Sequence, residues 1–162
     1  LMRIFARVLD QELDELHSQG VCLHHLGDLS GINPTLQQKV HNALELTKDN
    51  ARLILNVAFN YGGRAEIIHA VQQMLADGIE PDELNDELFS SYLFTAGLPD
   101  PDLVIRTSGE LRISNFLIWQ AAYAEYYPTP AYWPDFGREE LYESIVAYNQ
   151  RERRFGLVKE NT

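Results

Sequence analysis

Short apolar runs separated by segments of helical periodicity constrain the fold of this chain more than any other feature. Three runs cover Val21–Leu26, Leu53–Phe59 and Asp102–Thr107, and a fourth, Tyr126–Trp133, contains two prolines. Strands that are apolar without alternation are buried on both faces, which is typical of a parallel sheet covered by helices. The sequence therefore predicts an α/β fold with a mainly parallel central sheet flanked by helices.

The predicted helices lie between these runs. An amphipathic helix over 1–19 ends at Gly20, and a second helix begins at Asn33-Pro34 and runs to about Asp49. Further helices are expected over 65–75, from 80–82 through Phe89, over 116–124, and from 135 to near 156. The length of 162 residues suits a single domain over 1–162.

Composition narrows the possible functions. The chain has 24 acidic and 13 basic residues and a net charge of −11, which argues against nucleic-acid binding because that needs a broad basic face. No run approaches the roughly 18 apolar residues of a membrane span. The single cysteine, Cys22, excludes an internal disulfide and favours a reducing compartment such as the cytoplasm. His24 and His25, as adjacent strand residues, point to opposite faces and lack a third ligand with metal spacing.

The segment after the third predicted strand carries the clearest chemical signal. Arg106 ends the strand, a tight turn follows, and Arg112 and Ser114 come at the expected start of the next helix. Two guanidinium groups, several hydroxyls and a helix N-terminus are donors that suit a diphosphate. From the residues alone, a structural network in which the arginines pair with Glu110 and Asp102 is the alternative.

Two further polar features have both a functional and a structural interpretation. Glu125 follows an apolar helix and could hold a hard cation such as Mg²⁺, or it could be an ordinary helix-terminal glutamate. The basic run over 151–154 could extend a basic patch towards an anion, or its cations could simply favour a helix C-terminus.

Several motifs together resemble one enzyme family. They are Asp100-Pro-Asp-Leu-Val-Ile-Arg106-Thr-Ser-Gly-Glu, Arg112-Ile-Ser114-Asn-Phe-Leu-Ile-Trp-Gln, Ala124-Glu125-Tyr, Trp133-Pro-Asp-Phe136, Arg151-Glu-Arg-Arg-Phe-Gly156, Asn60-Tyr-Gly-Gly-Arg64 and His25-Leu-Gly-Asp28. This set is similar to the cis-prenyltransferase (isoprenyl transferase) family, which includes undecaprenyl diphosphate synthase. The resemblance extends from residue 1 to about residue 156.

The resemblance implies a transferase that condenses isopentenyl diphosphate with an allylic diphosphate such as farnesyl diphosphate. Its product would be a long cis-polyprenyl diphosphate that carries glycans for cell-wall assembly. By the same resemblance, Arg106, Arg112 and Ser114 bind the diphosphate of isopentenyl diphosphate. Arg154 and Gly156 match a C-terminal Arg-x-Gly motif that approaches substrate phosphate across a homodimer.

The resemblance also implies a cofactor and a product site. Glu125 matches the family's Mg²⁺-linked glutamate, and Val21 and Leu53 match positions near the closed end of the hydrophobic product tunnel. The expected protein is a cytoplasmic homodimer that contacts the membrane peripherally through its product. Leu111 departs from the pattern, because many members carry a polar residue there.

The family pattern begins before Leu1, with strands and a phosphate loop that carries the catalytic aspartate. We therefore expect this sequence to be the C-terminal two-thirds of a synthase, without a catalytic residue of its own, and inactive in isolation. The alternatives are a non-catalytic partner subunit of a heteromeric enzyme, a trans-type prenyl synthase and an unrelated phosphate-binding module. The retained arginines and Glu125 argue against the first, the strands against the second, and the length of the matching motifs against the third.

Overall fold

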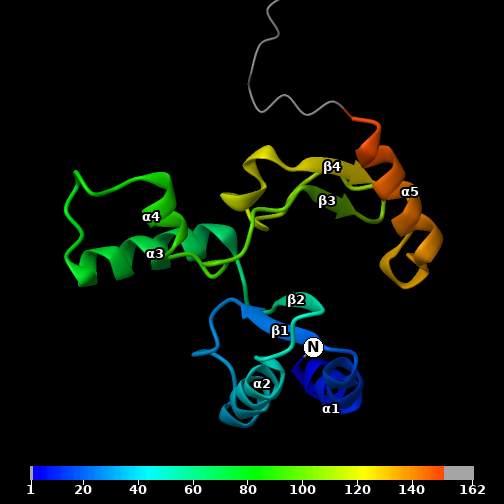
Figure 1. The fold of residues 1–162 in the computed structure, drawn as a ribbon, viewed down its shortest axis with the longest axis horizontal. Coiled ribbons are helices and arrows are strands. Elements are labelled where there is room, and N and C mark those ends of the chain that lie inside the picture. Colours follow the sequence, from blue (N-terminus) through cyan, green and yellow to red (C-terminus); the bar gives the residue numbers. More distant parts are fainter. Residues whose placement is uncertain (1, 152–162) are drawn as a thin grey trace, which may run out of the picture. The chain divides into compact units, whose positions relative to one another are not determined.

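The computed structural model describes residues 2–151, and the chain forms two compact units, Leu1–Gly97 and Leu98–Thr162. Each unit contains one pair of parallel strands accompanied by helices (Figure 1). This arrangement confirms the predicted α/β class with parallel strand pairing. That residues 1–162 form a single domain stays a prediction. Within the described residues, none of the helices combines the length and the apolar character needed to cross a bilayer.

The first unit is built on strands β1 (Val21–Leu26) and β2 (Leu53–Ala58), which pair in parallel register along their whole length. Helices α1 (Met2–Ser18) and α2 (Pro34–Thr47) pack against β1 and against each other (Figure 1). Their apolar faces bury a core that includes Val21, Leu23, Ile32, Leu36, Val40 and Ala43. Cys22 is a buried free cysteine, as its apolar surroundings in the sequence suggest.

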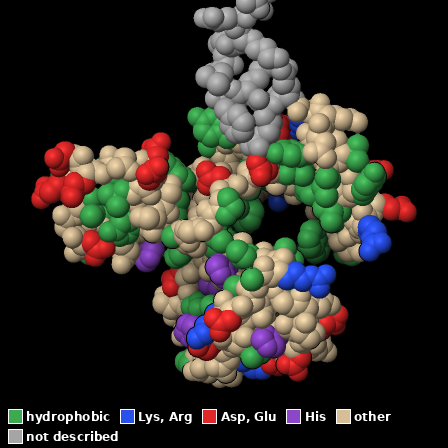
Figure 2. All heavy atoms as spheres, viewed as in Figure 1, with side chains coloured by type: hydrophobic (Ala, Val, Ile, Leu, Met, Phe, Trp, Pro, Cys, Tyr) green, Lys and Arg blue, Asp and Glu red, His purple; other side chains and the backbone are tan. Residues whose placement is uncertain are grey.

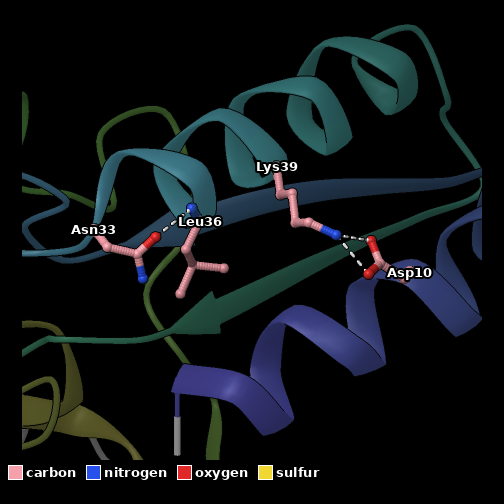
Figure 3. A network of polar contacts seen from close by, with 4 residues as sticks. All are labelled: Asp10, Asn33, Leu36 and Lys39. Carbon is pink, nitrogen blue, oxygen red and sulfur yellow. Dashed lines mark hydrogen bonds and ion pairs between the residues drawn. The ribbon is translucent and has the colours of Figure 1, made fainter.

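The start of α2 shows how sequence signals become local structure (Figure 3). The Asn33 Oδ1 accepts a hydrogen bond from the Leu36 N–H at 3.0 Å, and Pro34 occupies the first helical position. The cap satisfies one of the amide groups that have no partner within the helix. One turn further, the Lys39 ammonium pairs with both carboxylate oxygens of Asp10, which ties α2 to α1.

The second half of this unit holds α3 (Gly63–Asp77) and the short α4 (Asp86–Ser90). The prediction of a helix from residues 80–82 was wrong at its start, because Asn85 caps α4 and accepts from the Leu88 N–H at 2.9 Å. Acidic side chains gather over this part of the surface (Figure 2). They include Asp77, Glu80, Asp82, Glu83, Asp86 and Glu87.

Glu66 connects the first turn of α3 to the segment that follows α4. The residue is 1% exposed, and its carboxylate accepts hydrogen bonds from the Tyr61 hydroxyl at 2.5 Å and from the Phe94 N–H at 2.9 Å. Hydrogen bonds of this kind compensate the cost of burying a carboxylate. The Glu66 carboxylate therefore anchors both the turn before α3 and the segment around Phe94.

The second unit contains β3 (Leu103–Arg106), β4 (Glu125–Pro128) and α5 (Arg138–Asn149), with short 3₁₀ helices over Gln120–Tyr123 and Trp133–Asp135. The predicted strand Tyr126–Trp133 is shorter than expected, because the ladder ends at the first of its two prolines. The last helix begins after residue 135, where the Glu140 carboxylate accepts from the Gly137 N–H at 2.8 Å.

The prediction of a helix over 116–124 was largely wrong. Only the 3₁₀ turn Gln120–Tyr123 is helical there. The segment that precedes this turn contains Ser114, Asn115 and Leu117, whose φ values are 48°, 64° and 45°. A right-handed helix cannot contain residues in this left-handed conformation. The apolar run 116–119 is therefore a chain of turns.

Candidate functional site

Strand β3 presents Arg106 at its carboxyl end, as the sequence predicted. The Arg106 carbonyl accepts from the Thr129 N–H at 2.8 Å, which continues the pairing with β4. The Nε atom of Arg106 is buried and has no hydrogen-bond partner among residues 2–151. Buried polar atoms nearly always have partners, so a buried guanidinium nitrogen without one indicates a missing acceptor.

Arg106 and Arg112 line one pocket, with a volume of about 300 Å³, in the second unit. The other residues that line it are Val104, Ile105, Glu110, Leu111, Ile113, Phe116 and Tyr126. The two arginines therefore lie together, while their binding of a diphosphate stays a prediction. A pair of always-protonated, multiply donating groups is suited to phosphate oxygens.

The turn that follows β3 is fixed by backbone hydrogen bonds. Ser108 and Gly109 have φ values of 67° and 64°, and their N–H groups donate to the carbonyls of Ala131 and Thr129, both at 2.8 Å. A non-glycine residue in this conformation costs energy and persists only where its surroundings hold it. The loop that carries Glu110, Leu111 and Arg112 therefore starts from a defined geometry.

Arg112 also forms one ion pair of the alternative interpretation, in which the arginines belong to a structural network with acidic residues. Its Nη1 lies 2.5 Å from the Glu110 Oε2, and the Arg112 side chain is 65% exposed. An exposed ion pair is weak, typically 0–1 kcal/mol, so it does not prevent the guanidinium from binding an anion.

Ser114 lies in the same loop, two residues beyond Arg112, but it does not line the pocket. The helix N-terminus expected at this point does not form, because Ser114 and Asn115 are left-handed. The proposed contribution of a helix dipole to the phosphate site was therefore wrong. The contact between Ser114 and a diphosphate stays a prediction.

Glu125 is the first residue of β4 and lies opposite Leu103 in the register. Side chains alternate between the two faces of a strand, so Glu125 belongs to the face opposite to that of Val104, Arg106 and Tyr126. Its Oε2 accepts from the Arg151 Nη1 at 2.7 Å, and the Arg151 Nη2 donates to the Tyr126 carbonyl at 2.8 Å. Glu125 is not among the residues that line the pocket of Arg106 and Arg112.

A carboxylate is the right ligand type for Mg²⁺, but one carboxylate is an incomplete site. No group of three or more His, Cys, Asp or Glu residues within 2–151 is arranged to hold a metal ion. The described residues therefore contain no complete protein cage for a metal ion, although Mg²⁺ usually takes several of its ligands from water and substrate phosphates. The Mg²⁺ cofactor and the role of Glu125 in binding it stay predictions.

The predicted tunnel residues are register neighbours on β1 and β2 but differ in environment. Val21 is 5% exposed and packs with Leu23 and Ala43, whereas Leu53 is 57% exposed. Their role in limiting product length stays a prediction. Arg154 and Gly156, predicted to reach substrate phosphate, lie outside the described residues.

Another pocket, of about 860 Å³, lies in the first unit at the carboxyl ends of β1 and β2. It contains Asp28, Asn60 and Arg64, which belong to motifs singled out in the sequence, together with His69, which the motifs did not indicate. The Asn60 Nδ2 donates to the Asp28 carbonyl at 2.7 Å. Phe94 stacks on the His69 ring with centroids 5.2 Å apart, and no sequence signal placed this distant residue here.

Two groups in this pocket have shifted pKa values. Burial lowers the pKa of His25 below 6.5, and the hydrogen bond between its Nε2 and the Phe59 carbonyl, at 2.9 Å, partly opposes that shift. The Ser30 hydroxyl and N–H donate to the Asp28 carboxylate at 2.8 and 2.7 Å and lower the pKa of Asp28 below 3.8.

Comparison with known proteins gives one consistent result. A family described as "Putative undecaprenyl diphosphate synthase" matches residues 1–156. The isoprenyl transferase of Heliobacterium mobile is 47% identical over 98% of this chain, and the farnesyl-diphosphate-specific ditrans,polycis-undecaprenyl-diphosphate synthase of Pasteurella multocida is 46% identical over 99%. The chain spans 63% and 68%, respectively, of the length of these two relatives.

A solved structure agrees with the sequence matches. Lavandulyl diphosphate synthase from Lavandula x intermedia, crystallised with dimethylallyl diphosphate, superposes with a TM-score of 0.91 at 35% identity. The match covers 96% of this chain and 70% of that enzyme. The family match over 1–156 and these similarities show that this chain belongs to the undecaprenyl diphosphate synthase family, the cis-prenyltransferases.

Proposed function

We propose that this chain provides the isopentenyl-diphosphate site of a cis-prenyltransferase. In the proposed reaction, a carbon–carbon bond forms between isopentenyl diphosphate and an allylic diphosphate. The carbon–oxygen bond to the allylic diphosphate breaks, diphosphate leaves, and a proton is lost from the isopentenyl unit as the new cis double bond forms. The relatives named for farnesyl diphosphate support that compound as the allylic substrate.

The observation that carries this proposal is the buried Arg106 Nε, which has no hydrogen-bond partner among the described residues and lies in a pocket shared with Arg112. A diphosphate oxygen would supply the acceptor that Arg106 lacks within residues 2–151. Arg112 would add a second charged donor and exchange its exposed contact with Glu110 for the ligand. These residues therefore hold the diphosphate that the isopentenyl unit keeps, and so orient its reacting carbon.

The proposed magnesium requirement rests on the resemblance to the family. Mg²⁺ would supply positive charge to phosphate oxygens. Glu125 is the residue that the family pattern assigns to it, although Glu125 holds Arg151 here.

The assembly, location and product role are further parts of the proposal. Large apolar side chains are exposed over the second unit, including around α5 (Figure 2). They include Tyr123, Tyr132, Trp133, Leu141, Tyr142 and Ile145. Extensive apolar exposure marks interaction surfaces, which supports a homodimer. We place the enzyme in the cytoplasm, with its polyprenyl product delivered to the membrane as a glycan carrier.

The test is binding of isopentenyl diphosphate and inorganic diphosphate to the chain by calorimetry. The Arg106→Ala substitution should weaken binding of both ligands about 100-fold, because a charged donor to the diphosphate is lost. Arg138→Ala, which removes an arginine of α5 in the same unit, is the matched control and should bind as the unchanged chain does. Equal affinities for the two variants would rule out the assigned role of Arg106.

Catalysis is measured separately, as incorporation of labelled isopentenyl diphosphate into farnesyl diphosphate with and without Mg²⁺. Product that depends on Mg²⁺ would show that this chain is active without further residues. Binding without product would support the expected dependence on residues that the family carries elsewhere. Product that appears only with a second, active family member would favour the alternative of a non-catalytic partner subunit.

A further inference from the structure

Leu111 is a feature of the pocket that the diphosphate site does not explain. It lies between Glu110 and Arg112 and lines the same pocket as Arg106. Its relative exposure of 83% exceeds that of Trp133, at 74%, and of Leu75, at 72%. A single exposed leucine on a protein surface is ordinary. A highly exposed leucine in the lining of a charged pocket is more informative, because it bears on which ligand the pocket holds.

The composition of the pocket shows that phosphate is only part of what it can hold. Its charged residues are Arg106, Glu110 and Arg112. The remainder are apolar or aromatic: Val104, Ile105, Leu111, Ile113, Phe116 and Tyr126. A ligand that fills this pocket therefore has an anionic end and a hydrocarbon end, since apolar walls stabilise apolar groups withdrawn from water.

The size of the pocket restricts the hydrocarbon end. A volume of about 300 Å³ equals roughly ten water molecules in the liquid, and it lies at the lower limit for small-molecule pockets. A five-carbon diphosphate suits this volume, whereas a fifteen-carbon chain extends well beyond it.

We propose that Leu111 is a specificity-determining residue whose side chain packs on the five-carbon group of the diphosphate held by Arg106 and Arg112. This inference rests on the proposed function of the pocket. Leu111 is positioned by the anchored turn at Ser108 and Gly109, so little loop ordering is needed when the ligand arrives. Contact with the ligand removes the exposed leucine and the hydrocarbon from water together.

The test compares two ligands on the same chain by calorimetry: isopentenyl diphosphate, and inorganic diphosphate, which lacks the hydrocarbon. We expect Leu111→Ala to weaken isopentenyl diphosphate binding about tenfold and to leave inorganic diphosphate binding unchanged. Leu111→Met should retain the affinity of the unchanged chain for both ligands, because it keeps an apolar side chain of similar size. The matched control is Leu75→Ala, which truncates another highly exposed leucine, in the other unit.

Three outcomes would overturn the inference. If Leu111→Ala leaves the affinity for isopentenyl diphosphate unchanged, the leucine does not contact the hydrocarbon. If it weakens both ligands equally, the leucine acts on the charged end or on loop structure. If the unchanged chain binds neither ligand, the proposed diphosphate site fails and the inference fails with it, whereas the first two outcomes leave that site intact.

Discussion

Arg151 holds the start of β4 by two hydrogen bonds, one to the Glu125 carboxylate at 2.7 Å and one to the Tyr126 carbonyl at 2.8 Å. Arg151 follows α5, so these contacts join the end of the helix to the strand. Arg151→Ala should lower the free energy of unfolding of the second unit by about 1 kcal/mol. The expected loss is small because the Arg151–Glu125 ion pair is partly exposed, and charged hydrogen bonds contribute less stability where water reaches them.

Urea unfolding followed by tryptophan fluorescence measures this loss. Trp119 and Trp133 are the only tryptophans, and both belong to the unit Leu98–Thr162, so the signal reports that unit alone. Arg138→Ala is the control for loss of an arginine from the same region. Coincident unfolding curves for the two variants would show that the Arg151 contacts contribute nothing to stability.

Gly27 is the position in the first unit where a side chain is least tolerable. Its φ is +128°, and a Cβ atom there would lie 2.5 Å from the Phe59 carbonyl oxygen and 2.8 Å from that of Asn60. Because both neighbours are backbone atoms of the paired segment, Gly27→Ala should cost about 3 kcal/mol or more, combining strain with the clash. Unfolding followed by far-UV circular dichroism measures it.

Gly78 provides the comparison for Gly27, because it has a φ of +74° and none of the residues that the structure describes lies within 4 Å of the added carbon. Gly78→Ala should therefore cost only the conformational strain of about 1 kcal/mol. If the two alanine variants lose the same stability, the clash with Phe59 and Asn60 is relieved by backbone movement.

Asn33 caps α2, and Asn33→Ala should destabilise the first unit by about 1 kcal/mol through loss of the bond to Leu36. Asn42, within the exposed part of α2, bonds only to the Gln38 side chain among the contacts described. Asn42→Ala should be neutral or slightly stabilising, because alanine is the better helix former. Circular dichroism unfolding curves that shift in the same direction for both variants would contradict the capping role.

The elements that the sequence predicted well are those whose signals are local. The amphipathic pattern of α1, the Asn33-Pro34 start of α2 and the apolar runs of β1 and β2 each determine structure within a few residues. Arg106 and Arg112 were predicted to lie together because one ends a strand and the other follows a short turn. The proximity of the two arginines therefore follows largely from their short separation along the chain.

The errors and omissions arose where contacts between segments distant in the sequence determine the backbone conformation. The apolar run after Asn115 reads as a helix, but the left-handed conformations at Ser114 and Leu117 prevent one. The sequence predicts a turn at Ser108 and Gly109, but its geometry depends on hydrogen bonds to carbonyls twenty or more positions away, at Ala131 and Thr129. The Glu125–Arg151 pair likewise joins two segments whose proximity no periodicity in the sequence reveals.

His25 should make the stability of the first unit depend on pH. Its ring is part-buried and its Nε2 donates to the Phe59 carbonyl, a bond that both the neutral and the protonated ring can form. Burial is therefore what favours the neutral ring in the folded chain. Burial is the largest influence and lowers the pKa of His25 below 6.5, as does His41, while the Phe59 bond and Asp28 oppose the shift. Between that lowered pKa and 6.5, the unfolded chain therefore binds more protons than the folded chain.

The sign of the effect follows from this difference in bound protons. The contribution of His25 is fully present above pH 6.5 and is lost as the pH falls through its folded-state pKa. The lowered pKa of Asp28 acts in a separate range, below pH 3.8. His25→Gln keeps an amide donor for Phe59 but cannot titrate, so its unfolding free energy should decline less between pH 7 and pH 5 than that of the unchanged chain. His17→Gln, in α1, should retain the full decline, and an undiminished slope in His25→Gln would show that His25 is not the group responsible.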